Sequence, residues 1–253
     1  MTQLEPVSNS ESKPLGSPKA ILFTDWDGTV TLQDSNDYLT DHLGFGYEKR
    51  RAINDLMLDD KLSFRDGFHE MLESINVPFD KCIQYLLDNV QLDPGFKDTY
   101  HYCYENDIPV IVISSGMEQI IRALLISLVG ENAINNIEII SNKAVVKDDG
   151  SWYIQYRDDT SFGHDKSLSI KACLNRLDKD ANPILFYCGD GVSDLSAARE
   201  TNLLYARRGK DLVTYCKREN IPFKQFDSFE DILSSVKSIV SGESKLEDHM
   251  EKY

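Results

Sequence analysis

The stretch ILFTDWDGTV, residues 21–30, decides how the rest of this chain is interpreted. Residues 20–24 form a short, continuous apolar run, which is typical of a strand buried on both faces of a parallel sheet. Asp25, Asp27 and Gly28 follow directly. Such a sequence is a common turn, but it also places two carboxylates at the carboxyl end of a strand, where open α/β sheets bind ligands.

Three further apolar runs predict buried strands, and helical patterns lie between them. The predicted strands are 109–114, 183–188 and 202–206, and the predicted helices include 117–129 and 166–177. Strands that alternate with helices indicate an α/β fold with a doubly wound, mostly parallel, Rossmann-like sheet. Two β-prone runs flank Asp149-Gly150 within residues 143–159, which predicts a small β-hairpin excursion.

More than eighty residues separate the first two predicted strands, and their pattern is helical. Residues 63–75 place apolar side chains on one helical face, with Ser63 as the expected N-cap. A similar pattern follows Asp80, which we expect to cap it, and residues 47–60 predict another helix.

These patterns divide the chain into a core and an inserted helical domain. We expect an α/β core at 19–34 and 93–241, and a helical cap at 35–92. Residues 1–18 are rich in Ser, Pro and charge, which predicts a disordered lead-in. Residues 242–253 predict a polar C-terminal tail.

Composition narrows the classes of protein. The net charge of −15 in 253 residues argues against a nucleic-acid groove, which needs a basic face. No apolar run approaches the ~20 residues of a membrane span. The five cysteines are scattered without metal-site spacing, which favours a reducing, cytoplasmic location. The sequence indicates no oligomeric state and no partner beyond a small molecule.

Polar residues gather at the predicted carboxyl ends of the strands. They are Asp25 and Asp27, Ser114-Ser115-Gly116, Lys166 at a helix start, and Asp190 and Asp194. Two ionised carboxylates ~4 Å apart repel by about 4 kcal/mol at an effective dielectric constant of ~20. A hard cation would remove this repulsion, and oxygen ligands with space for water suit Mg²⁺.

Four segments that carry these residues resemble the haloacid dehalogenase-like hydrolases. They are FTDWDGTVTLQDSNDYLTDHLGFG (23–46), LDPGFKDT (92–99), FGHDKS (162–167) and YCGDGVSDLSAA (187–198). The resemblance covers roughly residues 20–240 and is closest to the phosphoserine phosphatase-like branch with a helical cap. Within that branch, the segments look most like fungal phosphatases of polyol phosphates, and the relatives include phosphatases of the methionine-salvage type.

The resemblance implies an Mg²⁺-dependent phosphatase of small phosphate esters. Asp25 would be the nucleophile that forms an aspartyl-phosphate. Asp27 would protonate the leaving alcohol and then activate water, for which its pKa must be raised. Ser114 would bind the phosphoryl oxygens together with the residues Ser115 and Gly116, and Lys166 would clamp them. The metal ligands implied are the Asp25 carboxylate, the Asp27 carbonyl and Asp190, with direct or water-mediated support from Asp194.

Several of these residues also have structural interpretations. Ser114 could instead cap the helix that begins near Met117, and Lys166 could be a surface lysine. Cys188 lies in a predicted strand, and we expect an inert core thiol.

Residues that would contact the rest of the substrate are predicted less directly. Asp34 lies nine residues after Asp25 and either accepts hydrogen bonds from substrate hydroxyls or caps a helix beginning near Ser35. Arg65 either reaches the site from the cap or is solvated. His164 either lines the rim or makes structural hydrogen bonds.

Other functions remain open at this point. A phosphatase of phosphoserine-like or methionine-salvage metabolites shares the same motifs, and a phosphomutase would return the phosphoryl group to a sugar hydroxyl. A phospho-accepting receiver domain is disfavoured because receivers lack an inserted helical bundle and a second acid placed like Asp27.

Overall fold

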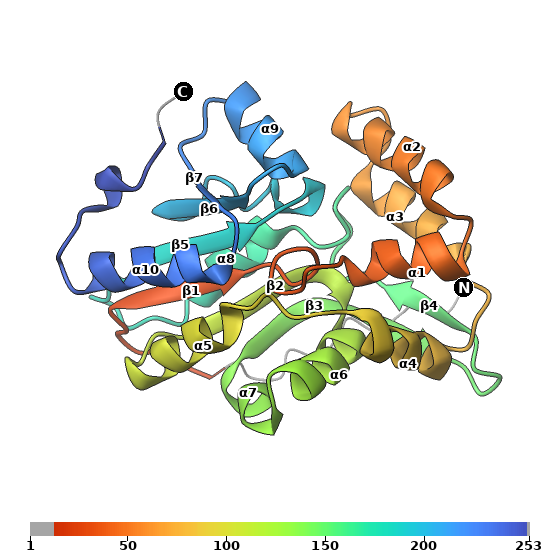
Figure 1. Ribbon diagram of the computed structural model, residues 1–253, viewed down its shortest axis with the longest axis horizontal. Coiled ribbons are helices and arrows are strands. Elements are labelled where there is room, and N and C mark those ends of the chain that lie inside the picture. Colours follow the sequence, from red (N-terminus) through yellow and green to blue (C-terminus); the bar gives the residue numbers. More distant parts are fainter. Residues whose placement is uncertain (1–12, 252–253) are drawn as a thin grey trace.

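A seven-stranded sheet with the order β4-β3-β2-β1-β5-β6-β7 lies at the centre of the molecule (Figure 1). The computed structural model describes residues 13–251. The strands are β1 (Ala20–Thr24), β2 (Val110–Met117), β3 (Glu138–Val146), β4 (Trp152–Gln155), β5 (Ile184–Gly189), β6 (Leu203–Arg207) and β7 (Lys224–Phe226). Every neighbouring pair is parallel except β3 and β4. The predicted α/β class with a doubly wound, mostly parallel sheet is confirmed.

Helices cover both faces of the sheet because side chains alternate along each strand. In β1, Ala20 and Leu22 pack into one apolar core, and Ile21 and Phe23 pack into a second. The first core includes side chains of α5 (Phe96–Glu105), α6 (Glu118–Leu128), α7 (Glu131–Asn136) and α10 (Phe229–Val240). The second includes those of α8 (Lys166–Leu174) and α9 (Asp211–Arg218).

Four helices connect β1 to α5, and we call them the cap. They are α1 (Ser35–Leu43), α2 (Tyr47–Leu58), α3 (Phe64–Glu73) and α4 (Phe79–Asn89). Figure 1 shows α1, α2 and α3 at one end of the molecule, away from α5 and α10. Ser63 caps α3, as predicted, by accepting a hydrogen bond from the Asp66 N–H. The prediction that Asp80 caps the next helix is wrong, because α4 starts after Pro78 and Asp80 lies in its first turn.

The predicted β-hairpin around Asp149-Gly150 is confirmed, and it extends the main sheet at its β3 edge. The first half of β3 pairs with β2 in parallel, and its second half pairs with β4 in antiparallel orientation. Gly150 lies in the connecting turn with φ +83°. Its carbonyl accepts a hydrogen bond from the Phe79 N–H, and the Trp152 Nε1–H donates to the Val77 carbonyl at 3.0 Å. The hairpin therefore contacts the cap near the start of α4.

Both ends of the described part of the chain, residues 13–251, contact the core. Residues 1–12 of the expected lead-in and the last two residues of the tail lie outside the described residues. The Leu15 N–H donates to the Arg176 carbonyl, and Gly16 pairs with Leu177. Residues 13–18 are therefore attached to the core and do not belong to a disordered lead-in. Near the other end, Glu251 pairs with Phe223. Within residues 13–251, no helix combines the length and the apolar character that a membrane crossing requires.

Candidate active site

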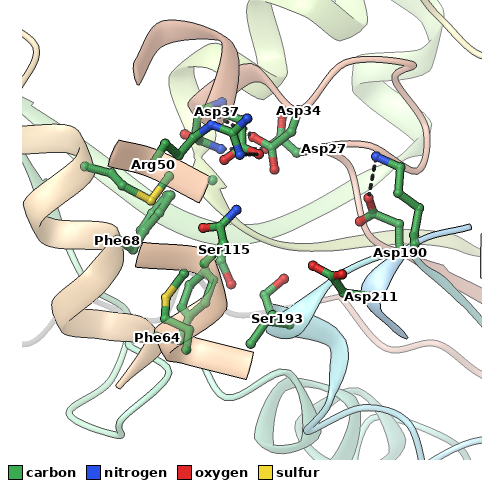
Figure 2. Close-up of a pocket in the computed structure, with 18 of the residues that line it drawn as sticks. Asp27, Asp34, Asp37, Arg50, Phe64, Phe68, Ser115, Asp190, Ser193 and Asp211 are labelled. Atoms are coloured by element: carbon green, nitrogen blue, oxygen red, sulfur yellow. Dashed lines mark hydrogen bonds and ion pairs between the residues drawn. The ribbon is translucent and has the colours of Figure 1, made fainter. Parts of the chain in front are cut away.

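A cavity of 310 Å³ lies between the carboxyl ends of the central strands and the cap. Asp25 and Asp27 enter it after β1, Ser115 enters it from β2, and Asp190 enters it after β5. The strand order changes direction between β1 and β5, so these residues lie at the switch point of the sheet. Figure 2 shows that Phe64 and Phe68 of α3 border the same space.

Asp25 is held at the floor of this cavity by buried partners. Its N–H donates to the Cys188 carbonyl at 2.8 Å, which fixes the backbone against β5. The Lys166 Nζ donates to Asp25 Oδ1 at 2.7 Å and to Asp194 Oδ1 at 2.6 Å. Lys166 is fully buried, so the interpretation as a surface lysine is wrong. Cys188 is a fully buried free thiol, as expected.

Asp194 organises the loop that follows β5. Its Oδ1 accepts hydrogen bonds from Lys166 and from the Tyr187 hydroxyl. Its Oδ2 accepts from the backbone N–H groups of Asp190 at 2.9 Å and Gly191 at 3.0 Å. Because each oxygen already accepts two hydrogen bonds, this carboxylate is better placed to orient Asp190 and Lys166 than to bind a cation directly.

Asp25, Asp190 and Asp194 each present an oxygen within 4.8 Å of the others. Burial, and then Asp194, raise the pKa of Asp190 to about 7, although Lys210 lies 3.6 Å away and lowers it. Burial also raises the pKa of Asp25, against the opposing effect of Lys166. Three carboxylates around one buried ammonium leave an excess of negative charge. A divalent cation would balance it, so the donor set fits Mg²⁺.

Gly28 permits the close approach of Asp190 to the chain that follows β1. Its φ is +71°, and a Cβ at this position would lie 2.3 Å from Asp190 Oδ2. Any other residue would be strained and would displace that carboxylate. The glycine of the opening stretch is therefore required by the carboxylate that lies against it.

Asp27 is buried in an environment that favours its protonated form. Its Oδ1 accepts from the Ser35 N–H at 2.8 Å, and its Oδ2 accepts from the Asn36 Nδ2–H at 2.9 Å. Burial raises its pKa well above the usual value, and Asp34 raises it further. A Cβ at Gly116 would lie 2.6 Å from Asp27 Oδ2, so this glycine leaves the space that the carboxyl occupies.

Two buried polar atoms of cavity-lining residues lack hydrogen-bond partners among the described residues. They are Ser115 Oγ and Asn36 Oδ1. A buried polar group without a partner costs about 1–3 kcal/mol, which a polar ligand could offset. Ser114 also lines the cavity, and its Oγ accepts from the Gly116 N–H at 2.9 Å. The interpretation of Ser114 as a helix cap is wrong, because α6 starts at Glu118 after Met117.

Asp34 caps a helix of the cap and also lies at the cavity. Its Oδ1 accepts from the N–H groups of Asn36 and Asp37 at 2.8 and 2.9 Å, which caps α1. The residue also lines the cavity. The capping interpretation is therefore confirmed, and Asp34 remains available to a ligand.

Arg65 and His164 do not line the cavity. The Arg65 Nη1–H donates to the Asp158 carbonyl at 2.8 Å, and its guanidinium lies over the Tyr156 ring. His164 is fully buried, with Nδ1 2.7 Å from the Ser114 carbonyl, and burial lowers its pKa to about 3. The prediction that they bind substrate is therefore not supported: Arg65 joins α3 to a core loop, and neutral His164 supports β2.

The cap residues that do line the cavity include two that the sequence prediction missed, Asp37 and Arg50. Figure 2 shows the Arg50 guanidinium beside Asp37 and Asp34. The Arg50 Nη1–H donates to Asp37 Oδ2 at 2.6 Å. Burial and Asp34 raise the pKa of Asp37, whereas Arg50 lowers it. The sequence contains a pattern from which Arg50 could have been found. One face of α2 carries polar side chains at helical spacing, Tyr47, Arg50 and Asn54, and all three line the cavity.

Comparison with known proteins finds similar sequences over most of the chain. The family model of haloacid dehalogenase-like hydrolases matches residues 22–199. Polyol phosphate phosphatase PYP1 of Saccharomyces cerevisiae is 56% identical over 238 residues, which cover 92% of this chain and 99% of that protein. Pdp3-interacting factor 1 of Schizosaccharomyces pombe is 50% identical over 211 residues, which cover 83% of this chain and 92% of that protein.

More distant proteins share the fold. A 2-hydroxy-3-keto-5-methylthiopentenyl-1-phosphate phosphatase of Bacillus cytotoxicus is 27% identical, with 87% of this chain and 96% of that protein covered. The structure of a phospho-aspartyl intermediate analogue of phosphoserine phosphatase superposes with a TM-score of 0.65 at 16% identity, covering 86% of this chain and 99% of that one. Together with the family model, these relatives show that the chain belongs to the haloacid dehalogenase-like hydrolases.

Proposed function

We propose that this protein is an Mg²⁺-dependent phosphatase that hydrolyses small phosphate esters through a phosphorylated Asp25. The observation that carries the proposal is the position of Asp25. Its carboxylate lies at the floor of a cavity, with a buried lysine on one oxygen and a second carboxylate, Asp190, close by. A nucleophile needs this combination of restraint and access.

Asp25 attacks phosphorus, the bond to the ester oxygen breaks, and the phosphoryl group remains on the carboxylate. Lys166 favours the ionised form of Asp25 and holds it in one rotamer, because its Nζ is shared between Asp25 and Asp194. Its side chain lies behind the nucleophile rather than in the lining of the cavity. We therefore propose a positioning role for Lys166, in place of a clamp on the phosphate.

Asp27 supplies the proton that the leaving alcohol requires. Its raised pKa favours the protonated carboxyl, and its hydrogen bonds with Ser35 and Asn36 fix its orientation. After the alcohol leaves, the Asp27 carboxylate can accept a proton from the water that attacks the phosphoryl group. General acid and base catalysis of this kind contributes typically 10²–10⁴-fold.

The phosphoryl oxygens have donors at the end of β2. The Ser115 hydroxyl has no partner among the described residues, and Ser114 and Gly116 line the same part of the cavity. Hydrogen-bond donors that are already in place stabilise charge as it develops on these oxygens.

The Mg²⁺ ligands would be the carboxylates of Asp25 and Asp190 and the Asp27 carbonyl. Asp194 would orient Asp190, because its Oδ2 accepts a hydrogen bond from the Asp190 N–H. The bound ion would supply positive charge next to the phosphoryl oxygens. It would also neutralise the excess negative charge of the carboxylates around Lys166. This accounts for an anionic substrate in a protein with a net charge of −15.

For the substrate, we propose sugar-alcohol phosphates. The support is the 56% identity with a protein named polyol phosphate phosphatase, over nearly the full length of both chains. The cavity volume of 310 Å³ is at the lower end of the ~300–1,000 Å³ typical of ligand pockets, which suits a small metabolite.

The test measures release of inorganic phosphate from a panel of esters, with Mg²⁺ or with EDTA. We expect polyol phosphates to be hydrolysed fastest, EDTA to abolish turnover, and added Mg²⁺ to restore it. Phosphate release in step with loss of the ester separates a phosphatase from a phosphomutase. Preference for phosphoserine would reject the substrate class, and full turnover in EDTA would reject the role of the metal.

A further inference from the structure

The cap contributes a charged pair to the cavity that the proposed reaction does not use. Arg50 and Asp37 both line the cavity, and Arg50 is only 7% exposed. Its Nη1–H donates to Asp37, and its Nε–H and Nη2–H donate to the two oxygens of Asp41 at 2.7 and 2.8 Å. Asp41 is not part of the cavity lining. Asp41 thus holds the guanidinium from outside the cavity, and Asp37 bonds to it at the cavity.

The pair still has hydrogen-bonding capacity. A guanidinium has five N–H donors, and the contacts with Asp37 and Asp41 occupy three of them. Asp37 Oδ1 accepts no hydrogen bond from residues 13–251, and 29% of this side chain is exposed. A hydroxyl group can donate to a carboxylate and accept from a guanidinium at the same time. An alkyl chain can do neither.

The local charge determines which chains fit. Among residues 13–251, six aspartates line the cavity against three cationic side chains, Arg50, Arg51 and Lys210. The ion pair with Arg50 favours the ionised form of Asp37. A substrate with a carboxylate at its far end would meet net negative charge. A neutral chain that carries hydroxyl groups would not.

Building on the phosphatase function proposed above, we infer that Asp37 and Arg50 bind the hydroxyl groups of the substrate chain. They are the specificity-determining residues of the cap, and they select sugar-alcohol phosphates over alkyl phosphates and over phosphates that carry a carboxylate.

Three esters of equal chain length test this inference: erythritol phosphate, butyl phosphate and phosphoerythronate. We expect the wild-type kcat/KM for erythritol phosphate to exceed that for butyl phosphate at least tenfold, the factor expected for one hydrogen bond to a charged group. In Asp37→Asn, this ratio should fall several-fold, because a neutral amide oxygen is a weaker acceptor than a carboxylate. The same variant should gain about three- to tenfold on phosphoerythronate relative to butyl phosphate, because a repulsive charge is removed.

Asp80→Asn is the matched control, since it removes the charge of an exposed cap carboxylate that does not line the cavity and does not contact Arg50. It should keep the preference for erythritol phosphate over butyl phosphate. Arg50→Lys is a second test if Asp37→Asn folds poorly. It should lower the preference for erythritol phosphate over butyl phosphate, because lysine lacks the planar guanidinium with its fixed N–H donors.

The outcomes separate this inference from the function on which it rests. If no ester is hydrolysed by the wild type, both the phosphatase function and the inference fail. If the esters are hydrolysed but Asp37→Asn and Arg50→Lys keep the wild-type ratios, the phosphatase function stands and the inference is overturned. A general loss of activity that leaves all ratios unchanged counts against it in the same way.

Discussion

Among the properties of single residues, the protonation state of Asp27 matters most for the proposed reaction. Burial and Asp34 raise its pKa, so the protonated form persists to higher pH than for an ordinary aspartate. Activity that requires this proton is present below the raised pKa and is lost as the pH rises through it. As the general acid, Asp27 therefore determines the pH at which activity falls on the alkaline side of the pH–rate profile.

Replacing Asp27 tests this role. We expect Asp27→Asn to lower kcat/KM about 10²–10⁴-fold for alkyl and polyol esters, whose leaving groups need a proton. The loss should be much smaller for p-nitrophenyl phosphate, since this leaving group departs without a proton. The measurement is kcat/KM for both ester types across pH, because this ratio covers only the steps up to departure of the leaving group. Equal losses for the two types would show that Asp27 is not the acid.

Two glycines near the acid cluster form a matched pair. A Cβ at Gly28 would lie 2.3 Å from Asp190 Oδ2 at a positive φ, whereas a Cβ at Gly191 would meet nothing within 4 Å. We expect Gly28→Ala to raise the Mg²⁺ concentration needed for half-maximal activity at least tenfold and to lower stability by ~1 kcal/mol or more. Gly191→Ala should resemble the wild type. Similar metal titrations for both variants would contradict this account.

At the scale of helices and strands, the predictions succeeded where apolar runs are continuous. The four predicted strands correspond to β1, β2, β5 and β6, because strands buried on both faces carry apolar residues at every position. β7 spans only Lys224–Phe226, which is too short to show a period. The start of β3 was missed because Glu138, Ser141 and Asn142 interrupt its apolar pattern, although the strand lies between β2 and β4.

Contacts between the hairpin and the cap could not be predicted, because they join residues far apart in the sequence. The Trp152 Nε1–H donates to the Val77 carbonyl, and the Trp152 ring packs on Phe79. Both contacts hold the turn between α3 and α4 against the hairpin. They fix one side of the cap over the cavity.

Removing the indole donor should loosen this side of the cap. Trp152→Phe keeps an aromatic ring beside Phe79 but deletes the hydrogen bond to Val77, at a cost of about 1 kcal/mol. We expect faster amide hydrogen exchange at 74–79 and 147–152, with unchanged exchange in β1. Tyr153→Phe, at an exposed neighbouring position, serves as the control. Unchanged exchange at the cap in Trp152→Phe would show that this contact does not hold it.

For the whole molecule, the acid cluster links stability to pH and to metal binding. The folded pKa of Asp190, about 7, lies above its ordinary value of 3.8. Between these pH values, the folded state binds more protons than the unfolded chain. The contribution of Asp190 to stability is therefore complete below pH 3.8 and is lost as the pH rises through about 7.

Asp190→Asn isolates this contribution from that of other buried groups such as His164. Without metal, we expect the variant to become more stable than the wild type as the pH rises from 4 to 7, by a few kcal/mol on an order-of-magnitude estimate. With Mg²⁺, the wild type should regain the advantage, because only it keeps this ligand. Thermal unfolding across pH, with EDTA or Mg²⁺, measures the difference. A difference that does not change with pH would contradict the account.

The residues at the sheet edge could be predicted from the sequence, whereas those of the cap mostly could not. Asp25, Asp27 and Asp190 directly follow apolar strands, and parallel topology brings such positions together. Arg65 and Arg50 occupy similar amphipathic helices, and only the packing of those helices on the core directs Arg50, and not Arg65, to the cavity. Packing of this kind depends on contacts between distant segments.

The central claim, that Asp25 carries the phosphoryl group, is tested most directly by trapping the intermediate. The enzyme is mixed with a polyol phosphate and Mg²⁺, quenched in acid within the first turnovers, and analysed by mass spectrometry of the intact protein and of its peptides. We predict one added phosphoryl group on the peptide that contains Asp25 in the wild type, and neither the adduct nor turnover in Asp25→Asn. Normal turnover in Asp25→Asn, or a phosphoryl group on another residue, would contradict the account.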